Sequence, residues 1–281
     1  YVIGVSQCSE DIWRDKLNDE LVMSTYQHDN VSLKFASAND NDKLQKQQIE
    51  QFIKEGVNLL IVSPNQIHTI SSVIDKAYDA GIPVILFDRK TDSKKYTAFI
   101  GADNYEAGHE MGLFIAHQLG GKGNVVEIGG LKGSSPAIER DRGFTEALKA
   151  YPDIKIVGRY YTDWQEERGA AVMDSILAQG MKIDYVFGQN DRIAAGARKL
   201  AMQRGEKAIK SVGIDALPVA GGGMEDVRDG RLVASYIYPT RGDLVMQLAL
   251  NILEKKPFHR DNYLKGTLVT IDNANALLLQ N

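Results

Sequence analysis

The chain has one cysteine among 281 residues and no long apolar run. A single cysteine, Cys8, excludes a disulfide within the chain and a zinc site built from several cysteines. The longest apolar runs, such as IPVILF at 82–87, are far shorter than the roughly 20 residues that a membrane-spanning helix needs. The net charge of −4 indicates that nucleic acid is not a partner.

Sequence motifs of the common enzyme classes are also missing. No Gly-x-Ser-x-Gly turn is present, and no Gly-x-Gly-x-x-Gly follows the first predicted strand. The glycine-rich segments at 120–123 and 129–135 lack the spacing of a phosphate-binding loop. The five histidines are scattered, so we expect no metal site. Together these absences predict a protein that is not an enzyme and carries no cofactor.

Short apolar runs alternate with longer amphipathic segments along the whole chain. Strands are predicted at 2–5, 31–36, 57–62, 84–87, 98–100, 124–128, 154–160, 185–187, 210–214, 232–237 and 268–271. Helices are predicted at 11–26, 42–55, 68–80, 105–119, 137–150, 165–178, 192–204, 219–228 and 244–253. This alternation predicts an α/β protein with parallel sheets covered by helices on both faces. Because the rhythm restarts near residue 98 and no low-complexity linker follows, we expect two doubly wound lobes.

Polar and aromatic residues cluster just after the predicted strands, where ligands of such sheets bind. The candidate ligand-binding residues are Ser9, Trp13, Arg14, Asp88, Arg89, Arg140, Trp164, Asn190, Asp215 and Tyr238. Carboxylates and amides bind vicinal hydroxyls, arginine donates through a planar fork, and indole suits an apolar C–H face. The set therefore predicts a sugar site. Structural roles remain open: the tryptophans as core, Asn190 as a helix cap, Asp88 with Arg89 as a surface ion pair.

Several segments in this order and spacing resemble the type I periplasmic sugar-binding family, and most of all its ribose-binding proteins. They are SPN at 63–65, GIPVILFDR at 81–89, IGADN at 100–104, RDRGF at 140–144, FGQND at 187–191 and VGID at 212–215. The resemblance implies that Asp88, Arg89, Arg140, Asn190 and Asp215 bind sugar hydroxyls, and that Trp13 and Trp164 stack on the ring. The first loop departs from the family pattern, and Tyr238 stands where the family commonly has glutamine.

The resemblance also implies how the two lobes are built from the chain. The N-terminal lobe would hold 1–102 plus 240–267, and the C-terminal lobe 103–239 plus 268–281. A three-segment hinge would join the lobes near 102–104, 237–240 and 268–271. A monosaccharide, ribose-like or a ketohexose such as fructose, would bind in the cleft between the lobes and favour their closure.

The opening of the chain, CSEDIWR at 8–14, resembles the periplasmic sensor domains of hybrid two-component systems in gut Bacteroides. This resemblance implies an extracytoplasmic domain of an inner-membrane histidine kinase, a periplasmic location, and as partner a membrane-anchored signalling protein or the remainder of its own chain. A homodimer would fit such a sensor. The alternatives are a soluble binding protein of an ABC sugar transporter, the effector core of a LacI-type repressor, and a sugar-modifying enzyme using Asp88 and Asp215.

Overall fold

Side-chain caps begin several helices at the residues where the sequence indicates a start. Asp11, Asn41, Asp103 and Asn190 each accept a hydrogen bond from the backbone N–H three residues further on, at 2.8–3.0 Å. Each cap satisfies one of the N–H groups that a helix leaves open at its first turn. At the other end of the second helix, Gly56 adopts a left-handed conformation with φ of 67° and closes the helix.

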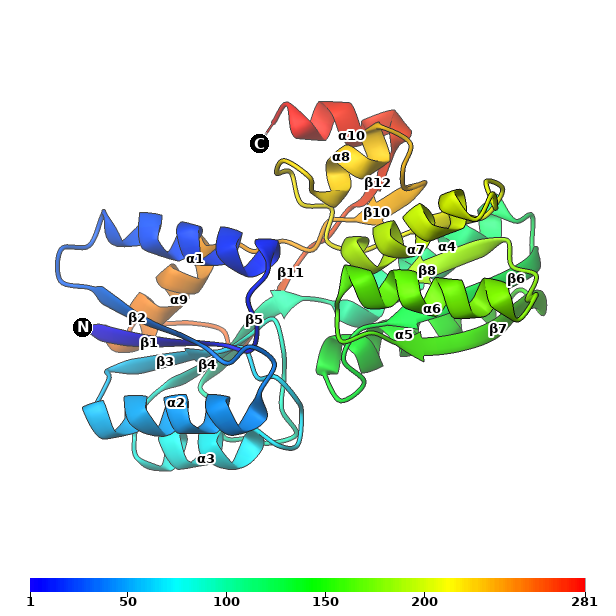
Figure 1. Ribbon diagram of the computed structural model, residues 1–281. Coiled ribbons are helices and arrows are strands. Elements are labelled where there is room, and N and C mark those ends of the chain that lie inside the picture. The colour runs from blue at the N-terminus through cyan, green and yellow to red at the C-terminus, as the bar shows by residue number, and fades with distance from the viewer. Residues whose placement is uncertain (281) are drawn as a thin grey trace. The chain divides into compact units, whose positions relative to one another are not determined.

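The structure is a computed structural model that describes residues 1–280 and forms two compact units (Figure 1). Unit 1 contains residues 1–102, 133–135 and 239–264. Its elements are β1 (Val2–Gln7), α1 (Ile12–Thr25), β2 (Ser32–Ser37), α2 (Asp42–Glu55), β3 (Leu59–Val62), α3 (Ser71–Asp79), β4 (Val84–Phe87), β5 (Ala98–Ala102), α9 (Gly242–Leu253) and β11 (Asp261–Leu264). The strands form one parallel sheet in the order β11-β5-β4-β3-β1-β2.

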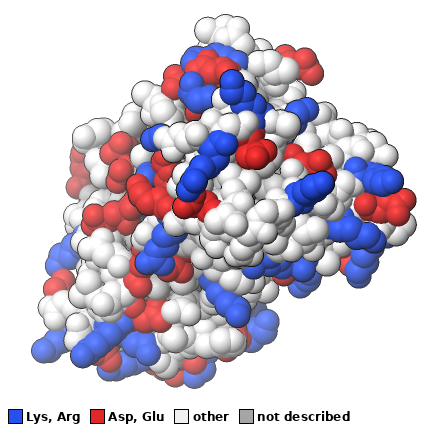
Figure 2. All heavy atoms as spheres, turned by 45° about the vertical axis from the view of Figure 1, so that its right-hand side comes forward, with Lys and Arg blue, Asp and Glu red and all other residues white. Residues whose placement is uncertain are grey.

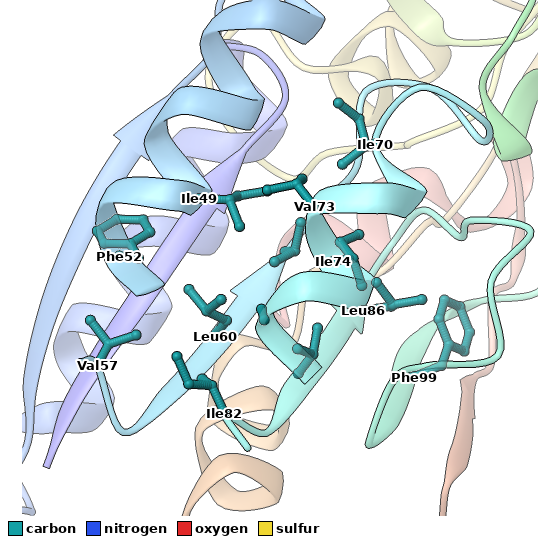
Figure 3. Close-up of a cluster of buried hydrophobic side chains, with 13 residues drawn as sticks. Ile49, Phe52, Val57, Leu60, Ile70, Val73, Ile74, Ile82, Leu86 and Phe99 are labelled. Atoms are coloured by element: carbon teal, nitrogen blue, oxygen red, sulfur yellow. The ribbon is translucent and has the colours of Figure 1, made fainter. Parts of the chain in front are cut away.

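Strand β3 is buried on both faces of the unit 1 sheet, because helices cover each face. Leu60 points to the layer of α2 and α3, where it packs among Ile49, Phe52 and Ile74 (Figure 3). Val62 belongs to the same buried cluster. Helices α1 and α9 pack against each other on the opposite face (Figure 1). This two-sided covering explains the nearly continuous apolar sequence of the strand.

Unit 2 contains residues 103–132, 136–238 and 265–281, of which 281 is not described. Its elements are α4 (Asn104–Gln118), β6 (Lys122–Gly129), α5 (Ser135–Leu148), β7 (Asp153–Tyr161), α6 (Glu166–Ala178), β8 (Tyr185–Gly188), α7 (Asp191–Gln203), β9 (Lys210–Val212), α8 (Gly223–Arg228), β10 (Ala234–Tyr236), β12 (Leu268–Thr270) and α10 (Ile271–Leu278). The strand order is β12-β10-β9-β8-β6-β7, and only β12 runs antiparallel to its neighbour.

Two glycines allow helices α4 and α5 to approach closely within unit 2. A Cβ atom on Gly108 would lie 2.1 Å from the carbonyl oxygen of Arg140, and one on Gly143 would lie 2.0 Å from that of Tyr105. Real Cβ atoms do not come this near to a backbone oxygen, so only glycine fits either position. The contact matters for the site described below, because α5 carries Arg140.

The expected fold class, two α/β units with parallel sheets covered on both faces, is confirmed. The sequence did not predict β11, whose four residues Asp261–Leu264 are largely polar, or α10, which follows β12 without an intervening turn. The helix predicted at 219–228 begins only at Gly223, because Gly222 is its cap. The predicted strand at 57–62 begins only at Leu59.

The close approach of α4 and α5 predicts that Gly143→Ala lowers the free energy of unfolding by about 2 kcal/mol or more, since backbone atoms must move to admit the methyl group. Urea unfolding of the two proteins measures the difference. Glu146→Ala, on an exposed position of the same helix, should change stability by no more than about 0.5 kcal/mol. An unchanged midpoint for Gly143→Ala would contradict the packing described here.

Candidate functional site

In unit 1, a buried ion pair joins Arg14 to Asp88. Arg14 lies in the first turn of α1, and its Nη2 donates to Oδ2 of Asp88 at 2.6 Å, while Nη1 donates to Oε1 of Gln7 at 3.3 Å. Burial alone would lower the pKa of the Arg14 guanidinium, but the neighbouring Cys8, Asp88 and Asp11 raise it above its ordinary value. The pair is 3% and 5% exposed, so each charge depends on the other for compensation.

Asp88 follows β4 directly and adopts a left-handed backbone conformation with φ of 61°. A Cβ atom on Gly101, in the adjacent strand, would lie 3.1 Å from the Cα of Asp88, so glycine there makes room for the turn. The next residue, Arg89, donates from Nη1 to the carbonyl oxygen of Asn65 at 3.0 Å. The turn thus presents a carboxylate and a guanidinium side by side, with Arg89 Nε 3.8 Å from Asp88 Oδ2.

Two further candidates of unit 1 lie near this pair. The indole of Trp13 stacks on Phe87 with ring centroids 5.7 Å apart, and the Arg14 guanidinium carbon lies 5.1 Å from the Trp13 ring. Ser9 donates from Oγ to Oδ2 of Asp11 at 3.2 Å. Ser9, Trp13, Arg14, Asp88 and Arg89 therefore gather at the carboxyl ends of β1 and β4.

In unit 2, the Arg140 guanidinium is held from several directions. Its Nε donates to Oδ1 of Asn104 at 2.9 Å, and its Nη1 donates to the carbonyl oxygen of Gln189 at 2.5 Å. Its central carbon lies 4.6 Å from the ring centroid of Tyr238 and 5.5 Å from that of Trp164. Aromatic faces attract a cation at these distances, so the position of Arg140 is set by both hydrogen bonds and rings.

Trp164 and Asn190 lie beside Arg140 at the carboxyl ends of β7 and β8. Trp164 has a left-handed backbone with φ of 69°, and a Cβ atom on Gly130 would lie 2.2 Å from its indole, so Gly130 makes room for that ring. Asn190 caps α7 through Oδ1 and donates from Nδ2 to the carbonyl oxygen of Trp164 at 3.4 Å. The cap and the candidate binding role therefore use different atoms of the same amide.

Asp215 completes the unit 2 set at the end of β9. Its backbone N–H donates to Tyr236 and its carbonyl accepts from Tyr238, which fixes Asp215 beside β10. The buried carboxylate of Asp191 accepts from the N–H of Ala216 at 2.6 Å and from Ser235 Oγ at 2.6 Å. Burial raises the pKa of Asp191 to about 7, although these hydrogen bonds act to lower it. Asp191 thus supports the loop that carries Asp215.

A second buried acid, Glu127 on β6, is connected to Arg140 through Gln189, whose carbonyl oxygen accepts from Arg140. Gln189 donates from Nε2 to Oε1 of Glu127 at 2.8 Å, and Arg159 donates from Nε to Oε2 at 3.1 Å. Burial and the nearby Asp141 raise the pKa of Glu127 to about 8, and the contacts with Gln189 and Arg159 only partly oppose this shift. The Gln189 side chain also accepts from the N–H of Gly130 at 3.1 Å, so it connects Glu127 to the strand ends.

The chemistry of both sets suits binding by hydrogen bonds and ring contacts. Within residues 1–280, no three His, Cys, Asp or Glu side chains are placed to hold a metal ion. No helix in that same range is sufficiently long and apolar to cross a membrane. On the face shown in Figure 2, Lys and Arg are interspersed with Asp and Glu and do not gather into a basic patch.

The sequence prediction named five residues that lie together in unit 1 and five that lie together in unit 2; the latter are Arg140, Trp164, Asn190, Asp215 and Tyr238. It missed the residues that hold them: Asn65, Asn104, Gln189 and Glu127. Three of these four lie inside the segments that carry the family resemblance, at 63–65, 100–104 and 187–191. Their position was therefore visible in the sequence, but nothing indicated which side chain contacts which.

The raised pKa of Glu127 predicts a pH-dependent penalty on stability. Between its ordinary pKa of 4.5 and about 8, the folded protein keeps a proton that the unfolded chain releases. The free energy of unfolding therefore falls as pH rises through this range, and the loss is complete above it. Glu127→Gln carries no charge, so we expect it to gain at least about 1 kcal/mol over the wild type between about pH 5 and pH 9.

Urea unfolding across this pH range measures the difference between Glu127→Gln and the wild type. Asp191 titrates in both proteins and cancels in the comparison. Glu50→Gln, at an exposed carboxylate, serves as the control and should follow the wild type at every pH. If the free energy of unfolding changes with pH in the same way for Glu127→Gln and the wild type, then the buried Glu127 carboxyl does not destabilise the protein at high pH.

Comparison with known proteins adds three close similarities. The chain is 47% identical to the fructose-binding periplasmic domain of hybrid two-component system BT1754, with a TM-score of 0.98, covering 100% of this chain and 94% of that one. It is 32% identical to the galactofuranose-binding protein YtfQ of Escherichia coli K12, over 77% of this chain and 71% of that protein. It is 29% identical to a xylitol-binding protein of Mycolicibacterium smegmatis, over 81% of this chain but only 65% of the relative.

The family comparison agrees with the α/β topology of the two units. Residues 3–257 match the periplasmic binding protein domain family, which is most of the chain. The resemblance drawn from the sequence segments is therefore confirmed. The chain belongs to the periplasmic binding protein domain family.

Proposed function

We propose that the chain is a non-enzymatic domain that binds a monosaccharide, and that this sugar is fructose or a closely related ketohexose in its furanose form. The observation that carries the proposal is the 47% identity, over the whole chain, to a fructose-binding periplasmic domain. The galactofuranose-binding relative supports a five-membered ring.

The residues at the strand ends have the chemistry that this ligand needs. Fructofuranose has several hydroxyls around a compact ring. Where a carboxylate lies next to a guanidinium, the carboxylate can accept a hydrogen bond from one hydroxyl while the guanidinium donates one to its neighbour. Asp88 with Arg89 supplies this combination in unit 1, and unit 2 contributes the guanidinium of Arg140 and the carboxylate of Asp215. Trp13 and Trp164 add apolar faces for the C–H groups of the ring.

We further propose that the domain lies in the periplasm as the sensing part of an inner-membrane histidine kinase and is not a transport protein. Support comes from the similarity to a domain of a hybrid two-component system. In this proposal, the sugar binds one conformation of the domain more tightly than another. Binding therefore shifts the population toward that conformation, and this shift is the signal. The membrane-anchored remainder of the chain, working as a dimer, would receive it.

Fructose at about 100 times its dissociation constant should stabilise the domain by about 2.7 kcal/mol and raise its melting temperature by several degrees. Arg140→Ala and Asp88→Asn should each weaken binding by at least about tenfold, since each removes a charge-assisted hydrogen bond to a hydroxyl. Thermal unfolding and calorimetric titration measure these effects.

Arg142→Ala is the matched control for Arg140→Ala, because Arg142 lies two residues further on the same helix and is exposed. It should bind fructose as the wild type does. A panel of ribose, glucose, galactose, arabinose and xylose tests selectivity. If no monosaccharide shifts the melting temperature, the proposal fails.

The sensor proposal predicts that fructose changes phosphorylation in the full-length protein. Membranes containing that protein, incubated with labelled ATP, should incorporate phosphate at a rate that depends on fructose, and Arg140→Ala should abolish the dependence. A full-length protein without a kinase domain, or with a DNA-binding segment in its place, would contradict the sensor role and leave the sugar-binding proposal intact.

A further inference from the structure

Asn104 is a buried residue to which the sugar-binding proposal assigns no role. It is the first residue of α4 and is 1% exposed. The cap of that helix is its neighbour Asp103, whose Oδ1 accepts from the N–H of Glu106 at 3.0 Å. Capping therefore does not require Asn104, and a buried amide needs another reason to be there.

Both ends of the Asn104 amide are engaged by residues of the candidate site. Its Oδ1 accepts from Nε of Arg140 at 2.9 Å, and its Nδ2 donates to the hydroxyl of Tyr238 at 3.0 Å. Because one end accepts and the other donates, the amide has a single favourable orientation. Asn104 consequently links Arg140 to Tyr238.

Tyr238 contacts the same guanidinium by its ring, whose centroid lies 4.6 Å from the central carbon of Arg140. Arg140 is thus held at Nε by Asn104, at Nη1 by the carbonyl oxygen of Gln189, and across its face by Tyr238. These contacts involve Nε, Nη1 and one face of the guanidinium, and together they define its orientation.

We propose that Asn104 is a positioning residue for sugar binding: together with Tyr238, it orients the Arg140 guanidinium before the sugar arrives. The inference rests on the proposed function, because it takes Arg140 as a sugar ligand. A flexible arginine would lose side-chain freedom on binding, and an arginine that is already oriented avoids that cost. Asn104 needs no contact with the sugar to have this effect.

A double-mutant cycle on fructose affinity tests the role. Asn104→Ala should weaken binding by about tenfold in the wild-type background, but by less than about twofold in Arg140→Lys. The reason is that lysine keeps the charge and lacks the Nε that Asn104 holds. A purely structural role would lower affinity equally in both backgrounds. Asn124→Ala, at an amide of unit 2 that bonds to the carbonyl of Lys182, is the control and should leave affinity unchanged.

Equal losses in the two backgrounds, or an unchanged affinity of Asn104→Ala, would overturn the role of Asn104. If circular dichroism shows that Asn104→Ala does not fold, Tyr238→Phe replaces it in the cycle. That variant keeps the ring and removes only the hydroxyl that accepts from Asn104, so we expect a loss of about threefold that again disappears in Arg140→Lys. A wild-type protein that binds no sugar would instead overturn the proposed function itself.

Discussion

Buried charge at the carboxyl ends of parallel strands is the constraint on which the rest of the site depends. Helices cover both faces of each sheet, so the strand ends are where polar side chains gather, and a charge placed there loses most of its water. Unit 1 compensates Asp88 with Arg14. Unit 2 compensates Arg140 with an amide, a carbonyl oxygen and two aromatic faces. Both arrangements hold a guanidinium in a fixed place.

Backbone strain is concentrated at the same strand ends. Asp88, Asp163, Trp164 and Asp215 all have positive φ, although none is glycine. Aspartate tolerates this region better than most residues, but a tryptophan there costs stability, and such conformations persist only where their surroundings enforce them. The glycines at 101 and 130 provide the necessary space. Three of these four residues, Asp88, Trp164 and Asp215, are among those that we propose to bind sugar.

Much of the fold could be predicted from the sequence, because β3 and β4 are continuous apolar runs and Asp11, Asn41 and Asn190 are recognisable caps. The two elements that were missed, β11 and α10, lack those signals: β11 is polar, and α10 follows β12 directly. The candidate site residues were predicted from their place after strands. Asn104 and Gln189 could not be assigned a role in this way, because their roles depend on contacts between residues far apart in sequence.

The way the chain is divided between the two units affects the order in which they can be built. When synthesis has reached residue 238, unit 1 still lacks α9 and its edge strand β11, and unit 2 still lacks β12 and α10. The segment from 239 onward completes unit 1 first and then unit 2. Unit 1 can therefore finish folding only after residues up to 264 have been made, and unit 2 only after β12 and α10 have followed, so a truncation near residue 238 would leave both of them incomplete.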